Sequence, residues 1–93
     1  MMRRDVRPPL FGFALALAER QVFTHDATGI GLFVRCARGT IRLVDPEGAV
    51  HVLAPGDRWG TTRRGRLALE ALTSARVELE VALAPVRSGA RER

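Results

Sequence analysis

The sequence predicts an all-β domain of seven to eight short antiparallel strands. Apolar residues alternate with polar or small ones along most of the chain, which is the period of a half-buried strand. Turn-forming residues recur at roughly ten-residue spacing, as in a sandwich or a small barrel. In addition, 46% of the 93 residues are hydrophobic, which is normal for a globular protein and excludes wholesale disorder.

A hairpin over residues 39–57 is the strongest local signal. Ile41 and Leu43 alternate with polar neighbours, as expected for one strand. Asp45-Pro46-Glu47-Gly48 has the composition of a tight turn, and Pro55-Gly56 fits the centre of a type II turn. We therefore expect strand, turn, strand and a second turn.

The second strand of this hairpin contains one of the two histidines. Val50 and Val52 resume the alternation, so His51 points to the opposite side. We expect His51 to face solvent or a partner.

The remaining strands are predicted from the same alternation. A helix is the alternative for residues 67–83, because Ala, Leu, Glu and Arg are good helix formers. Two blocks of period two on either side of Thr73-Ser74 favour strands instead. The predicted strands cover residues 11–18, 21–24 (as a continuation or a short second strand), 30–36, 58–62, 66–72 and 77–83, with turns at 25–29, 37–39 and 63–65.

The length predicts one domain. We assign residues 1–10 to a basic N-terminal arm, residues 11–84 to the domain and residues 85–93 to a flexible basic tail. The apolar run before Ala16-Leu17-Ala18 resembles a secretory signal, but its alternation favours a strand. We therefore expect a cytoplasmic protein, and no membrane partner because no run approaches ~20 apolar residues.

Charge and cysteine content limit the partners and the chemistry. All 15 basic residues are Arg, and six of them lie in residues 1–7 and 87–93. Residues 8–86 therefore contain nine Arg and eight Asp or Glu. The net charge of +5 thus comes mainly from the ends. Cys36 is the only cysteine, which excludes an intramolecular disulfide, and its place on an apolar face predicts a core residue.

Gly39, the following hairpin and the Leu53-Ala54-Pro55-Gly56-Asp57 turn resemble the centre of a cupin. Over residues 13–83 the chain resembles small single-domain bacterial cupin-like proteins. This resemblance implies a small β-barrel or RmlC-like jelly roll, here with flexible Arg-rich termini.

The resemblance also locates the positions at which cupin enzymes hold a metal. The Glu ligand would fall at Leu32 and the His pair near His25 and Ala27, while the second motif has no His between Thr62 and Ala68. We therefore expect no metal, no other cofactor and no enzyme activity. We also expect an apolar interior that side chains fill.

Trp59 and a group of arginines are the candidate ligand-binding residues. Trp59 either closes one end of the barrel or lines a ligand mouth or dimer contact. Arginines on neighbouring strands and their turn can bind a phosphate, or form a solvated face paired with Glu70, Glu78 or Glu80. The candidate site consists of Trp59, Arg58, Arg64 and Arg66, and Arg63 completes the basic cluster.

His25 and Asp26 are adjacent, which raises the possibility of an acid–base pair. Neighbouring residues of an extended chain rarely point the same way, so we do not expect a pair and assign both residues to a turn.

Taken together, the sequence favours a metal-free, cupin-like binding or regulatory module that forms a homodimer. A small-molecule ligand is possible, but the sequence does not identify it. The alternative is nucleic-acid or other polyanion binding through the Arg58–Arg66 cluster and the basic tails.

Overall fold

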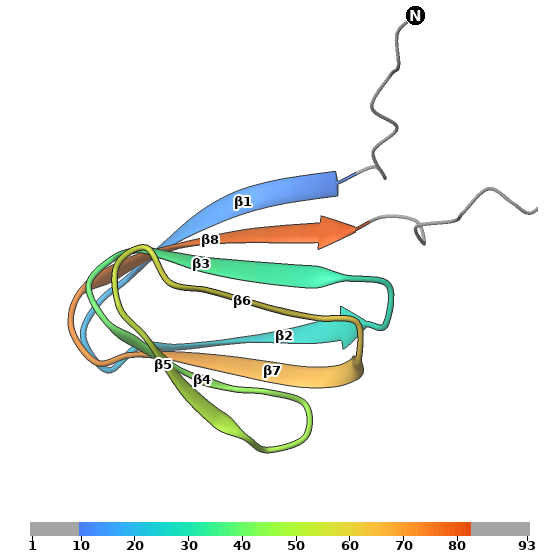
Figure 1. Ribbon diagram of the computed structural model, residues 1–93. Helices are drawn as coiled ribbons and strands as arrows, with labels where there is room; N and C mark the ends of the chain where they lie inside the picture. Colours follow the sequence, from blue (N-terminus) through green and yellow to red (C-terminus); the bar gives the residue numbers. More distant parts are fainter. Residues whose placement is uncertain (1–9, 83–93) are drawn as a thin grey trace, which may run out of the picture.

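Two antiparallel sheets make up the molecule. The computed structural model describes residues 10–82, which form eight strands and no helix. The first sheet has the order β1-β8-β3-β6 and the second β2-β7-β4-β5, and they form two layers (Figure 1). The prediction of an all-β fold with antiparallel strands is confirmed. The strands are β1 (Leu10–Leu17), β2 (Val22–Thr28), β3 (Leu32–Arg38), β4 (Ile41–Val44), β5 (Val50–Leu53), β6 (Arg58–Thr61), β7 (Arg64–Ala71) and β8 (Ala75–Ala82).

The core lies between the sheets and follows the predicted alternation. Ile41 and Leu43 of β4 are fully buried, as are Leu67, Leu69 and Ala71 of β7 and Val77 and Leu79 of β8. Within residues 10–82 no polar or charged side chain is buried, which confirms an apolar interior. The side chains with no exposed surface are Cys36, Ile41, Leu43, Leu67, Leu69, Ala71, Val77 and Leu79.

An aromatic contact closes each side of the molecule where edge strands of the two sheets meet. On one side, Phe13 of β1 lies 6.4 Å from the ring of Phe23 of β2, which stacks on His25. On the other side, the ring centroid of Trp59 in β6 lies 5.7 Å from that of His51 in β5. Both histidines thus help to close the gap between the layers.

The prediction of a turn over residues 25–29 is wrong. β2 continues to Thr28, and each of its residues pairs with β7, from Val22↔Glu70 to Thr28↔Arg64. Phe23, His25 and Ala27 alternate toward the interior, which is why the strand runs on. His25 stands in the middle of this strand.

The predicted arm and tail lie outside the described residues, except that Leu10 already belongs to β1. The alternation over Phe13, Leu15 and Leu17 does form a strand, as expected. In the part of the chain that the structure describes, no helix is long and apolar enough to cross a membrane.

Candidate functional site

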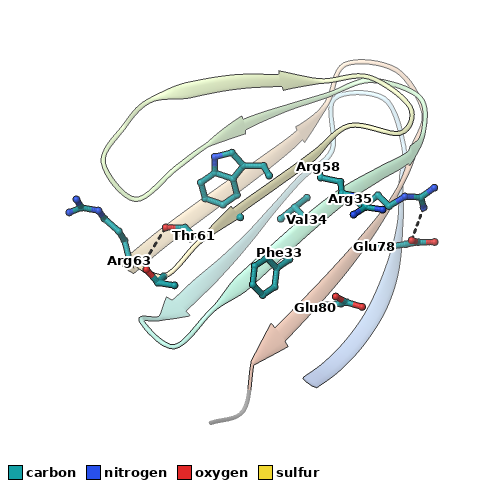
Figure 2. A pocket seen from close by; sticks show the side chains of 11 residues that line it. Phe33, Val34, Arg35, Arg58, Thr61, Arg63, Glu78 and Glu80 are labelled. Atoms are coloured by element: carbon teal, nitrogen blue, oxygen red, sulfur yellow. Dashed lines mark hydrogen bonds and ion pairs between the residues drawn. The ribbon is translucent and has the colours of Figure 1, made fainter. Parts of the chain in front are cut away.

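A groove runs along the first sheet beside its edge strand β6. It has a volume of about 900 Å³ and is open on one side. Its lining comes from β6, from the neighbouring strand β3 and from the outward residues of β8, and includes Phe33, Arg35, Arg58, Trp59, Glu78 and Glu80 (Figure 2). We call this feature the β6 groove.

The strand register arranges the groove in two rows across β6, β3 and β8. In one row Phe33 stands between Gly60 and Glu80. In the next row Arg35 stands between Arg58 and Glu78. Opposed residues of an antiparallel pair point to the same face of a sheet, so these side chains share the outer surface.

The second row contains two like charges side by side. Arg35 is directly opposite Arg58, an arrangement that is unfavourable in an antiparallel pair. Arg35 is compensated by Glu78, whose carboxylate accepts a 2.8 Å hydrogen bond from the guanidinium. Arg58 forms no ion pair within residues 10–82. The row therefore has an uncompensated positive charge in the groove.

The first row provides an apolar floor. The Phe33 ring lies against Gly60, where an added Cβ would come within 2.7 Å of its Cδ1 atom. Phe33 is nevertheless 45% exposed, because its other side faces the groove. Glycine at position 60 is thus what lets an aromatic ring lie flat on the edge strand.

Trp59 connects the groove to the hairpin of β4 and β5. It packs against the buried core and is also one of the residues around the groove, and its partner on β3 is the buried Val34. Its neighbour His51 hydrogen-bonds through Nε2 to Asp45 Oδ2 at 3.1 Å. The hydrogen bond with His51 is the main reason that the pKa of Asp45 lies below its usual value.

The expectation that His51 faces solvent or a partner is wrong. His51 is half-buried and shares its side of β5 with Leu53, which is buried. Val50 and Val52 instead point outward, with 55% and 58% of their surface exposed. Val50 and Val52 do alternate with His51 and Leu53, but the two valines lie on the solvent face.

The predicted basic cluster is divided between the two sheets. Arg58 lies on β6 and lines the groove, whereas Arg64 and Arg66 lie on β7 of the other sheet. The chain crosses between the layers at Thr62 and Arg63. The structure therefore brings together Arg58 and Trp59 of the candidate site, and places Arg64 and Arg66 elsewhere.

The expected ion-pair partners of the cluster also differ from the observed ones. Arg63 pairs with Glu47 at 2.7 Å and the Arg66 guanidinium lies 3.4 Å from Asp26. Glu78 pairs with Arg35 and Glu70 with Arg42. Residues adjacent in sequence end on different sheets, so the nearest carboxylates are not those that sequence order suggests.

Two of the positions that a cupin enzyme would give to metal ligands belong to the core, whereas His25 is half-buried in β2. Leu32 is 2% exposed and Ala27 6% exposed, both among apolar side chains. Within residues 10–82, no three His, Cys, Asp or Glu side chains form a group that could hold a metal ion. His25 and Asp26 point to opposite faces of β2, so they form no acid–base pair.

Sequence reasoning missed Phe33, Arg35 and Glu80 as groove residues. The signal was present, since Phe33 and Arg35 alternate with the apolar residues of β3 and so lie on its opposite face. What was missing was the neighbour relation of β3 with β6 and β8, which depends on strand order.

No protein-family model and no curated protein matches the chain. Among solved structures, the chain is similar to an HTH_3 family transcriptional regulator from Vibrio cholerae, with a TM-score of 0.70 and 17% identity. The similarity covers 78% of this chain and 42% of that one, so this chain matches less than half of the regulator's length. At this identity the likeness concerns the fold.

Proposed function

We propose that the chain is a metal-free, cupin-like, non-enzymatic binding or regulatory domain that holds a small organic anion in the β6 groove. The observation that carries the proposal is the Arg58–Arg35 pair beside the exposed Phe33 ring. Two further points support it. Leu32 and Ala27, which stand at two of the metal-ligand positions of a cupin, are apolar core residues here, and the structurally similar protein is a transcriptional regulator whose chain is longer than the shared fold.

The groove favours a ligand with a flat apolar part and one acidic group. A carboxylate or phosphate near Arg58 would relieve the repulsion between Arg58 and Arg35 and form charge-assisted hydrogen bonds. The apolar part would lie on Phe33, whose ring is on the same face of the sheet as Arg58. Aromatic carboxylates are the simplest molecules with both features.

Trp59 provides the test, because it is the only tryptophan of the chain and lines the groove. Benzoate and phenyl phosphate are titrated against the full chain, with Trp59 emission and isothermal titration calorimetry as readouts. We expect saturable binding of both, and none of acetate, which lacks the ring.

Arg58→Ala is expected to weaken binding of these probes by about 10- to 100-fold, the usual value of a hydrogen bond to a charged group. Arg64→Ala is the matched control, because Arg64 is an exposed arginine that does not line the groove. Its affinity for benzoate is expected to equal that of the unaltered chain. No saturable binding of either ring-bearing anion, or equal losses in the two variants, would overturn the proposal.

The polyanion alternative remains a separate prediction, and the split of the arginines between two sheets gives it less support. A DNA duplex added in place of benzoate separates the two ideas. Polyanion binding would be weakened by Arg64→Ala as much as by Arg58→Ala, and it would fall steeply with added salt.

A further inference from the structure

The free edge of β1 differs from the other edges of the two sheets. Within residues 10–82, β1 pairs with β8 alone, over eight residues with no register shift. Its sequence, Leu-Phe-Gly-Phe-Ala-Leu-Ala-Leu, has no charged residue and no proline. By contrast, the edge strands β5 and β6 are four residues long, and β2 contains Asp26. Short strands and charges are what usually keep a sheet edge from pairing with another chain.

Aromatic side chains accompany this edge. Three of the four phenylalanines of the protein, Phe11, Phe13 and Phe23, lie on the side where β1 and β2 meet. Phe11 is 54% exposed, although it shares the inward-facing side of β1 with Leu17, which is buried. The apolar face of the first sheet therefore continues to the edge and is left partly open there.

We propose that the β1 edge binds the β1 edge of a second copy of this chain, so that the first sheets join into one eight-stranded antiparallel sheet. The sequence predicts a homodimer but does not locate its interface, and the proposal places that interface at β1. A two-fold axis perpendicular to the sheet pairs β1 with itself and keeps both inward faces on the same side. The exposed phenylalanines of the two copies then meet beside the new strand pair.

The absence of charged residues on β1 favours a second copy of this chain as the partner that pairs with its edge. An edge without charged residues is best matched by another such edge, and among residues 10–82 β1 is the one long edge strand of this kind. Its outward residues Gly12, Ala14 and Ala16 are small. The acidic residues Glu78 and Glu80 of the two copies would be separated by three strand spacings, about 14 Å, which is beyond the Debye length in physiological salt.

The test is the mass of the full chain in solution. Size-exclusion chromatography with light scattering is expected to give the mass of two chains, against 10.2 kDa for one. Phe11→Lys places a charge at the proposed interface and removes an exposed ring, so we expect the dimer dissociation constant to rise by about tenfold or more. Ala14→Lys changes an exposed position on the same strand and is expected to act in the same direction.

Phe33→Lys is the matched control, because Phe33 is an exposed phenylalanine of the same sheet that lies away from β1. It is expected to leave the dimer mass unchanged, and circular dichroism checks that every variant keeps its strands. A monomeric full chain, for instance because its own terminal residues or another protein cover the edge, would overturn the proposal. So would a Phe11→Lys variant that dimerises as well as Phe33→Lys does.

Discussion

Asp45 shows how much one residue does in the β4–β5 hairpin. Its Oδ1 atom accepts hydrogen bonds from the backbone N–H groups of Glu47 and Ala49, both at 2.9 Å. Its Oδ2 atom bonds to His51, whose ring contacts Trp59 on the other sheet. A single carboxylate thus shapes the turn and orients the histidine that closes this side of the molecule.

The stability of the protein is expected to fall in acid partly because of Asp45. A carboxyl with a pKa below its ordinary value stabilises the fold at every pH above that ordinary value, about 3.9, and this contribution is lost as the pH falls through the folded-state pKa. Urea unfolding of the wild type and of Asp45→Asn at pH 7 and at pH 3 measures the effect. Asp45→Asn should lose less free energy of unfolding between these pH values than the wild type.

His51→Ala provides the companion measurement, because the bond to His51 is the main cause of the lowered pKa of Asp45. It should also reduce the acid dependence. An Asp45→Asn protein with the same loss as the wild type would contradict this account.

The same pair marks the limit of prediction at the residue scale. The turn role of Asp45 could be predicted, because an Asp-Pro-x-Gly sequence has local causes. The orientation of His51 could not, because alternation does not reveal which side of an edge strand faces the core. Val50 and Val52 are apolar and exposed, whereas His51 is polar and half-buried.

At the scale of elements, Gly39 holds the β3–β4 connection against the start of β8. It has a φ of 75°, and a Cβ placed there would collide with the Ser74 carbonyl oxygen and the backbone of Ala75. Two separate constraints therefore require glycine at this position. Ala75 is the first residue of the paired strand β8 and Ser74 directly precedes it, so these backbone atoms are held in place.

Gly39→Ala is expected to destabilise the protein by about 2–4 kcal/mol, from left-handed backbone strain and overpacking together. Gly48→Ala is the matched control: its φ is 88°, but nothing lies within 4 Å of the added Cβ. We expect it to cost only about 1 kcal/mol. Thermal or urea unfolding measures both, and equal losses would show that the close approach to Ser74 is unimportant.

Most strands could be predicted from the sequence, because each owes its burial pattern to local alternation. β4, β7 and β8 have their expected inward residues, and the Pro55-Gly56 turn is closed by the bond from the Asp57 N–H to the Ala54 carbonyl. The missed segments are the second half of β2 and the start of β7, where Arg64 and Gly65 pair with β2 although the sequence predicts a turn over 63–65. His25 and Asp26 have turn-like composition, but pairing with β7 overrides it.

At the scale of the whole molecule, strand order decides what the candidate site contains. Arg58 and Arg64 are six positions apart in sequence and lie on different sheets, whereas Arg58 and Arg35 are distant in sequence and directly opposite each other. Local sequence patterns predict where strands occur, but they do not predict which strands pair with each other in a sheet. The sequence therefore identified Arg58 and Trp59 of the β6 groove but not the residues that β3 contributes to it.

Cys36 reports on the integrity of the whole fold. Burial is the main reason that the pKa of its thiol lies above the usual value, and the thiol donates hydrogen bonds to the carbonyl groups of Arg38 and Gly39. It has no exposed surface, so we expect a disulfide reagent at pH 8 to label the native protein at a rate set by unfolding. Labelling should accelerate with urea in parallel with the loss of folded Trp59 emission.

A Cys36→Ala, Ala54→Cys variant is the control, because position 54 is exposed and should react at once without urea. Rapid labelling of Cys36 in the absence of urea would mean that the molecule opens locally around the residue 38–40 turn. It would contradict a core that opens only as a unit.

The position of β8 has a consequence for how the protein is made. β8 is the last of the strands that the structure describes, and within residues 10–82 β1 pairs with no other strand of its sheet. Residues 10–17 must therefore wait until residues 75–82 have been synthesised before the two strands can pair. Pairing between distant segments is slow, and during this interval an uncharged, aromatic strand remains exposed. We therefore expect chaperones that bind apolar segments to have access to β1 until β8 has been made.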